Sequence, residues 1–185
     1  MLLQPYNPLW SVQFQAIKAE IEKVLDPTCF PIEHVGSTAV PFLDAKPIID
    51  IDIIFHNPSD FIQIKTGLQQ LGYYHNGNQG IQGRDVFKRS GLNYQNVLDT
   101  IPHHLYVCLS SCPALERHLL LRDHLRKNDN ARLQYQSLKY EMAHLAYQDR
   151  KHYQELKELH INGFIDAIID LEKNNGPSPR STNSN

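Results

Sequence analysis

The chain has 185 residues, of which 41% are hydrophobic, so it is long enough for about one domain with an ordinary core. Its formal net charge is −2, which argues against extended nucleic acid as a partner and favours a small nucleotide-like or phosphorylated ligand. No segment approaches the roughly 20 apolar residues of a membrane span, and the N-terminus lacks the pattern of a signal peptide.

The cysteines also restrict the class of protein. Cys29, Cys108 and Cys112 are odd in number and show no paired Cys-x-x-Cys spacing, which argues against both a disulfide framework and a zinc site. Unpaired cysteines are typical of a reducing compartment. The sequence therefore predicts a cytoplasmic protein with no membrane partner.

The first predicted element is an amphipathic helix from about Pro8 to Leu25, which Asp26-Pro27 is expected to end. Its apolar residues recur every three or four positions and form one stripe: Trp10, Phe14, Ile17, Ile21 and Val24. A short strand from Cys29 to Val35 follows. On this strand we interpret His34 as a structural histidine.

The most informative stretch is a Gly36-Ser37-Thr38 turn followed by an apolar strand near residues 48–55 that contains Asp50 and Asp52. Side chains two residues apart on a strand share a face, so the two carboxylates are expected side by side. The residues expected on the opposite face are Ile49, Ile51 and Ile53. Carboxylates this close repel each other unless a cation lies between them, and Mg²⁺ suits such a pair because it also binds water and phosphate oxygens.

The turn predicts the other half of a phosphate site. Gly36 lets the backbone approach a ligand, while Ser37 and Thr38 offer hydroxyl and N–H groups at the start of a short helical turn. Lys46 is either a phosphate contact or a solvated loop lysine. A Gly-Ser turn or an Asp-x-Asp strand is common without function, but in this order they are the minimum equipment for metal-assisted nucleotidyl transfer.

The middle of the chain predicts one helix and two strands. Asn57-Pro58-Ser59-Asp60 indicates a helix start, and Gly72 indicates its end. Residues 73–83 are expected to be a strand end plus loop. Arg84–Arg89 is a short basic strand whose charges either bind phosphate or protect a sheet edge. A second loop from Ser90 to Thr100 precedes a strand from His103 to Leu109.

The two histidines of the last strand are adjacent, so they face opposite sides of the sheet. We expect His104 to share the face of the two aspartates, where it could supply a third metal ligand, because this strand contains no carboxylate. Asp85 and Asp99 are the other nearby acids, and neither is well placed.

The last third predicts three helices, over about 113–127, 130–147 and 150–171, with Asp129-Asn130 as the N-cap of the second. Their basic residues are expected to be solvated helix charges: Arg117, Arg122, Arg126, Lys139 and Lys157. Residues 173–185 are expected to form a disordered tail, which leaves residues 1–172 as a single domain.

Two stretches of the chain resemble known protein families. Gly36-Ser37 followed by Asp50-Ile51-Asp52 resembles the signature of the polymerase-β-like nucleotidyltransferase superfamily. More closely, residues 32–41 and 45–50 resemble the GrpB-like family of that superfamily, and residues 119–126 are also similar to it. The resemblance extends over about residues 6–171. One departure is Phe42, which stands where the family usually has glycine.

The resemblance implies an α/β, nucleotidyltransferase-like fold with a small mixed sheet, flanking helices and a helical C-terminal third. It also implies Mg²⁺-dependent transfer of a nucleoside monophosphate from a nucleoside triphosphate to a hydroxyl of a small molecule or protein. Asp50 and Asp52 would hold the metal, and Gly36 and Ser37 the phosphates. Further candidate contacts to the ligand phosphates are Arg122 and Lys139.

Two other functions stay open. Superfamily members usually add a third carboxylate from a later strand, and its absence here favours a non-catalytic nucleotide- or phosphometabolite-binding module as the alternative. A metal-dependent phosphohydrolase that uses the same acids is a third possibility, and the fold alone does not decide among them.

Overall fold

The structure is a computed structural model of the chain, and it describes residues 2–92 and 94–175. Within these residues one mixed sheet has the strand order β1-β2-β5-β4-β3. The strands are β1 (Ile32–Val35), β2 (Ile49–Phe55), β3 (Tyr73–His75), β4 (Arg84–Arg89) and β5 (His103–Leu109). The helices are α1 (Leu9–Ile21), the 3-10 turn η1 (Ser37–Ala39), α2 (Asp60–Gln70), α3 (Asn96–Thr100), α4 (Pro113–Lys127), α5 (Asp129–Leu145), α6 (Arg150–His160) and α7 (Asn162–Asn175).

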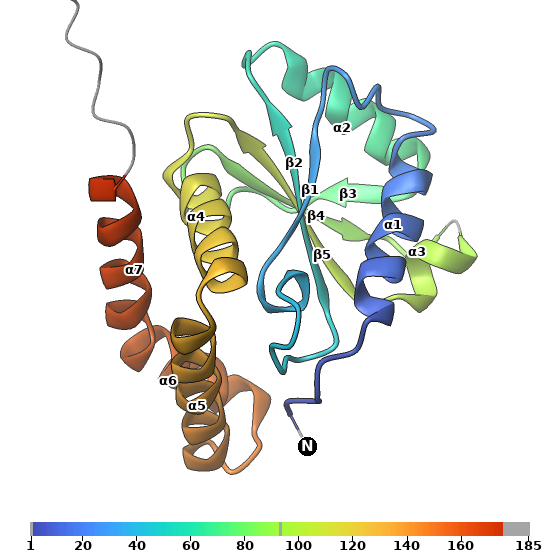
Figure 1. Cartoon of the computed structure of the whole chain (residues 1–185). Helices are drawn as coiled ribbons and strands as arrows, with labels where there is room; N and C mark the ends of the chain where they lie inside the picture. The colour runs from blue at the N-terminus through green and yellow to red at the C-terminus, as the bar shows by residue number, and fades with distance from the viewer. Residues whose placement is uncertain (1, 93, 176–185) are drawn as a thin grey trace, which may run out of the picture.

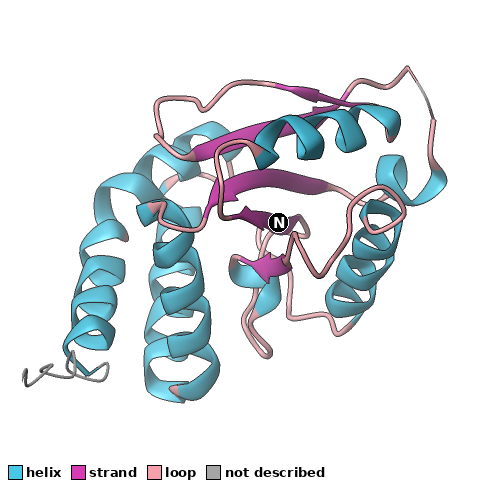
Figure 2. Ribbon diagram, turned by 90° about the horizontal axis from the view of Figure 1, so that it is seen from above, coloured by secondary structure: helices cyan, strands magenta, loops and turns pink. Residues whose placement is uncertain are grey.

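The centre of the sheet is the parallel pair β2 and β5, and the other neighbouring strands pair antiparallel. The register places Asp50 of β2 between Val35 of β1 and His104 of β5. Helices lie on both sides of the sheet (Figure 1): α1, α2 and α3 on one side, and α4 and α7 on the other. The view from above also shows helices around the sheet (Figure 2).

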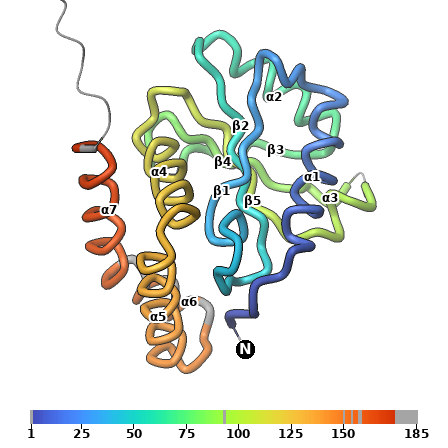
Figure 3. Tube along the Cα trace, viewed as in Figure 1, coloured from blue at the N-terminus to red at the C-terminus, as the bar shows by residue number. Residues whose placement is uncertain are grey.

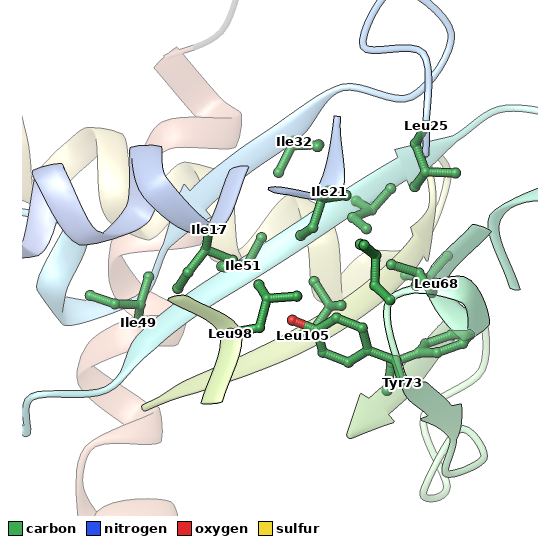
Figure 4. Close-up of a cluster of buried hydrophobic side chains, with 14 of the residues drawn as sticks. Ile17, Ile21, Leu25, Ile32, Ile49, Ile51, Leu68, Tyr73, Leu98 and Leu105 are labelled. Carbon is green, nitrogen blue, oxygen red and sulfur yellow. The ribbon is translucent and has the colours of Figure 1, made fainter. Parts of the chain in front are cut away.

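A first core fills the space between the sheet and the layer of α1, α2 and α3 (Figure 4). The predicted stripe of α1 packs there, with Ile17 and Ile21 fully buried against Ile51 of β2. Each such side chain contributes about 1.5–3 kcal/mol when it leaves water. This core explains why one face of β2 consists of isoleucines.

A second core lies among the C-terminal helices and includes Leu3, Val40 and Leu43 from the first quarter of the chain. The first residues of the chain therefore lie beside the C-terminal helices, as the trace in Figure 3 shows. There the Leu2 N–H donates to Gln148 Oε1 at 2.8 Å. Because Val40 follows η1 directly, this core also anchors the Gly36–Thr38 turn to the helical layer.

The predicted α/β class, with its mixed sheet and helical C-terminal third, is confirmed, and several details were wrong. The expected four-strand sheet gains β3, and the expected loop over 90–100 contains α3. The side chain that caps α5 is Asn128, which accepts from the Ala131 N–H at 3.0 Å, one residue before the predicted Asp129-Asn130 pair.

The helix predicted over 150–171 is two helices that meet at Ile161. The three-and-four spacing holds from Ile161 to Ile168, but the step from Leu156 to Ile161 is five, and Asn162 and Gly163 also weaken helical continuity. The turn buries Ile161 completely and returns α7 against α4. Helix α7 continues to Asn175, so residues 173–175 of the expected tail are helical, and the rest of that tail lies outside the described residues. No helix in the described part of the chain is long and apolar enough to span a membrane.

Candidate active site

The two aspartates of β2 lie on one face of the sheet, which we call the acidic face. Ile49, Ile51 and Ile53 point into the first core on the other face, as the alternation predicts. The environments of the two carboxylates differ: the side chain of Asp50 is 30% exposed, whereas that of Asp52 is 0% exposed. Asp50 is therefore the carboxylate that a ligand can reach from solvent.

Each aspartate is hydrogen bonded to a histidine. His104 Nδ1 of β5 donates to Asp50 Oδ1 at 2.8 Å, and His118 Nδ1 of α4 donates to Asp52 Oδ2 at 2.8 Å. The second oxygen of Asp52, Oδ1, is buried and has no hydrogen-bond partner among the described residues. A buried carboxylate oxygen without a protein partner is costly, and Oδ1 remains available as an acceptor.

The Gly36–Thr38 turn packs directly on Asp50. Gly36 has a φ of 71°, in the left-handed region that glycine tolerates. A Cβ at this position would lie 2.3 Å from Asp50 Oδ2, so a side chain and the present carboxylate position exclude each other. The turn continues into η1, the short helical turn predicted at Ser37.

His34 and Thr38 hold the turn from the inside. His34 Nε2 and the Thr38 hydroxyl are hydrogen bonded at 3.0 Å, and that hydroxyl also donates to the Ile48 carbonyl at 3.3 Å. The His34 ring stacks on Phe14 of α1 with centroids 4.7 Å apart. Burial, assisted by the charge of Arg126, lowers the pKa of His34 to about 4. His34 is therefore a structural histidine, as predicted, and its ring is neutral near pH 7. The Thr38 hydroxyl is already bonded within the turn.

A cavity of about 450 Å³ lies between the acidic face, the turn and the C-terminal helices. Gly36, Ser37 and Asp50 line it on the sheet side, and four basic side chains also line it: Lys46, Arg84, Arg117 and Arg122. Its volume is in the range of small-molecule sites. The arrangement combines a reachable carboxylate with basic side chains, which suits an anionic ligand.

Two of the three basic residues predicted to contact phosphate line this cavity, and the third does not. Lys46 lines the cavity and its ammonium lies 4.1 Å from the Tyr153 ring centroid. Arg122 also lines it, but donates to Glu33 at 2.6 Å and to the His34 carbonyl at 3.0 Å. Lys139 is 2% exposed and donates to the Asp44 carbonyl away from the cavity lining, so the prediction of a solvated lysine was wrong.

The third ligand expected from β5 is the main difference from a complete metal site. His104 shares the acidic face, as predicted, whereas His103 faces the opposite side, where its Nε2 meets the Tyr73 hydroxyl at 2.6 Å. His104 contacts Asp50 as a hydrogen-bond partner, and the described residues contain no cluster of three or more side chains that could hold a metal. Asp85 and Asp99 bond elsewhere, to His75 and Arg89.

The comparison with known proteins settles the family. A model of the family described as GrpB protein matches residues 1–169. The chain belongs to the GrpB family. UPF0157 protein YqkA of Bacillus subtilis (strain 168) is 35% identical over 138 residues, which cover 75% of this chain and 38% of YqkA. The chain therefore spans well under half of that relative.

Solved structures agree with this membership. The crystal structure of the conserved protein GrpB from Enterococcus faecalis aligns with a TM-score of 0.74 at 26% identity, and covers 92% of this chain and 99% of that one. A structure of the Cid1 poly(U) polymerase with MgGTP bound aligns with a TM-score of 0.51 at 11% identity, over 76% of this chain and 44% of Cid1. The second likeness shows a polymerase-type nucleotidyltransferase fold and nothing finer.

Phe42, where the resemblance to the family predicts a glycine, has a distinctive backbone conformation. Phe42 has a φ of 63°, a left-handed conformation that costs a non-glycine residue about 1–2 kcal/mol. Its exposed ring lies 5.6 Å from the Tyr6 ring centroid and 5.6 Å from the Arg132 guanidinium carbon. The loop thus keeps a glycine-like backbone while its side chain packs outside.

Three residues of this GrpB site were missed from the sequence. His118 lies three residues after Leu115 and four before Arg122, so helical spacing already placed it on the inner face of α4. Glu33 is paired with Asp52 in the register of β1 and β2. Tyr106 is opposite Asp52 in β5; burial and then Asp50 raise its pKa, so its hydroxyl stays protonated at neutral pH.

Proposed function

We propose that this GrpB-family protein is a Mg²⁺-dependent nucleotidyltransferase that moves a nucleoside monophosphate from a nucleoside triphosphate to a hydroxyl group. One observation supports the proposal above the others. The Gly36-Ser37 turn packs against Asp50 at the edge of a basic cavity, and Asp52 lies beside Asp50 on the same face. A phosphate-binding turn in contact with a carboxylate pair is what metal-assisted phosphate chemistry needs.

The residues present fit Mg²⁺. This ion needs only one or two protein carboxylates and takes its remaining ligands from water and phosphate oxygens, so the lack of a third acid on β5 does not exclude it. The unpartnered Oδ1 of the buried Asp52 is an acceptor that a cation would satisfy. We assign the metal to Asp50 and Asp52, with His104 as the hydrogen-bond partner that orients Asp50.

The chain's own groups have separate roles in this proposal. Gly36 and Ser37 bind the phosphates through the turn, and Lys46 and Arg122 add positive charge from the cavity wall. Bound Mg²⁺ supplies charge neutralisation on the triphosphate. The acceptor oxygen forms a bond to the α-phosphorus while the bond to the β-phosphate oxygen breaks and pyrophosphate leaves. The hydroxyl proton passes to an aspartate, directly or through water.

We also propose the setting of the reaction. The partners are a nucleoside triphosphate and a small-molecule or protein acceptor, without extended nucleic acid or membrane, since the net charge is −2. A cytoplasmic location rests on the cysteines, because Cys29, Cys108 and Cys112 are all free thiols.

A second function has one observation in its favour. The residues of β5 nearest the aspartates are His104 and Tyr106, so the later strand adds no carboxylate. This favours a binding module that retains the nucleotide site without turnover.

Isothermal titration tests both functions. The full chain is titrated with a non-hydrolysable ATP analogue and with GTP, each with Mg²⁺ and with EDTA. The transferase proposal expects Mg²⁺-dependent binding that Asp50→Asn abolishes, while Asp170→Asn, which removes an exposed carboxylate of α7, behaves as wild type. Metal-independent binding that survives Asp50→Asn supports the binding module, and the absence of any binding refutes both.

A further inference from the structure

The basic strand β4 is not an edge strand. It lies between β5 and β3 in the sheet, so its charges do not protect an exposed edge. The alternation of the strand then separates its basic residues. Arg84 is opposite Cys108 and Val86 is opposite Tyr106, which places Arg84, Val86 and Lys88 on the acidic face and Arg89 on the other.

Arg89 has a structural role. Its guanidinium donates to both oxygens of Asp99, at 2.9 Å and 2.7 Å, and to the Leu71 carbonyl at the end of α2. Its charge is therefore compensated within the fold. The basic residues of β4 that lack such an ion pair among the described residues are those on the acidic face, Arg84 and Lys88.

Arg84 and Lys88 have no compensating carboxylate. No ion pair involves either residue within the described part of the chain, and Lys88 is exposed. The Arg84 guanidinium carbon lies 4.8 Å from the Tyr106 ring centroid, and its Nε is buried without a hydrogen-bond partner among the described residues. A buried guanidinium nitrogen without an acceptor favours an anionic ligand, since such groups are normally satisfied.

These two cations line a second cavity, of about 700 Å³, that adjoins the first and is also lined by residues of the opposite face, among them Arg89 and His103. The two cavities share four lining residues, Ile81, Arg84, His104 and Tyr106. One of these four residues, His104, also bonds Asp50. The acid of the second cavity, Asp99, is already paired with Arg89, so Arg84 and Lys88 set its charge.

We propose that the second cavity is the acceptor subsite, and that the acceptor is a small molecule with a phosphomonoester group bound by Arg84 and Lys88. This inference rests on the proposed function. A phosphomonoester carries close to two negative charges at pH 7, which matches two uncompensated cations, and guanidinium geometry suits its oxygens. The position of His104 directs the rest of the molecule, with its hydroxyl, toward Asp50.

Inorganic phosphate is the probe for the test. Amide shifts of the full, isotope-labelled chain are followed by NMR in metal-free buffer as phosphate is added, with acetate as the comparison anion. Phosphate is expected to shift β4 and β5 amides saturably. Loss of a charge-assisted hydrogen bond should weaken binding roughly tenfold in Arg84→Gln and in Lys88→Gln. Lys127→Gln, which removes an exposed charge at the end of α4, should bind as wild type.

The outcomes separate this inference from the proposed function. Phosphate binding at wild-type strength in Lys88→Gln overturns the subsite, as does an equal response to acetate. The Lys88 side chain is exposed, so a loss of binding in this variant is not caused by unfolding. In a second experiment, the phosphate titration is repeated with the ATP analogue and Mg²⁺ present. Continued phosphate binding supports a separate acceptor site, and displacement assigns Arg84 to the nucleotide instead. Failure of the analogue to bind refutes the transferase, while the metal-free phosphate titration still decides the anion site.

Discussion

Acidification should destabilise the protein through His34, whose neutral ring holds the turn of the candidate site. The histidine pKa falls from an ordinary 6.5 to about 4 in the folded chain because the ring is buried, with Arg126 adding to the effect. Between these values the unfolded chain binds a proton that the folded chain does not. The free energy of unfolding therefore rises with pH in this window, and stability is lost as pH falls from 6.5 toward 4.

The size of the effect follows from the two pKa values. One pKa unit corresponds to about 1.4 kcal/mol, so a difference of roughly two and a half units gives about 3 kcal/mol when pH reaches 4. The ring is 8% exposed, so solvent screening reduces this little. A loss of this size is a large fraction of the stability of a typical domain.

Urea denaturation at pH values from 7 to 4.5 measures the effect, with His34→Gln as the variant that cannot titrate. Other groups cancel in the difference between wild type and variant. That difference should change by about 1.4 kcal/mol per pH unit below pH 6.5. His56→Gln, at an exposed histidine beyond β2, should follow wild type. Parallel curves for wild type and His34→Gln across this range would refute the reasoning.

Two further predictions concern the cavity. Gly36→Ala should lower the free energy of unfolding by about 1–2 kcal/mol because the backbone is left-handed there. It should also abolish Mg²⁺-dependent nucleotide binding, because the added Cβ displaces Asp50. The control Gly77→Ala has the same φ of 71° with nothing within 4 Å of the added Cβ, so it should lose stability without losing binding. Denaturation and titration calorimetry check the pair, and intact binding in Gly36→Ala would contradict it. Lys46→Met should weaken nucleotide binding about tenfold, whereas Lys139→Met should leave it unchanged because Lys139 does not line the cavity. Equal losses in calorimetry would contradict this placement.

Strand periodicity made much of the site predictable. Because side chains alternate with a period of two, residues of β2 could be assigned to the acidic or the apolar face without a structure. The same rule separated His104 from His103. These inferences held because they depend on one strand and on its immediate neighbour in the sheet, whose burial pattern the sequence contains.

Contacts between distant elements were not predictable in the same way. His118 meets Asp52 across 66 positions of sequence, and this depends on how α4 crosses the sheet. Burial of Lys139 follows from the fold of the segment near Asp44, which leaves a carbonyl facing α5. The break at Ile161 was missed, although the step of five residues from Leu156 to Ile161 interrupts the three-and-four spacing there.

The difference between the two aspartates indicates what the site is built for. Folding alone would favour an apolar residue in place of Asp52, since replacing a buried ion pair by well-packed apolar groups is often neutral or stabilising. Instead Asp52 is fully buried, bonds His118 through one oxygen, and leaves the other oxygen without a partner. Asp50, beside it, is partly exposed and in contact with a glycine turn. A buried carboxylate next to a partly exposed one is unfavourable for folding alone, and under the proposed function a cation bound to both would offset this cost. The proposed function accounts for this cost by ligand binding at Asp50.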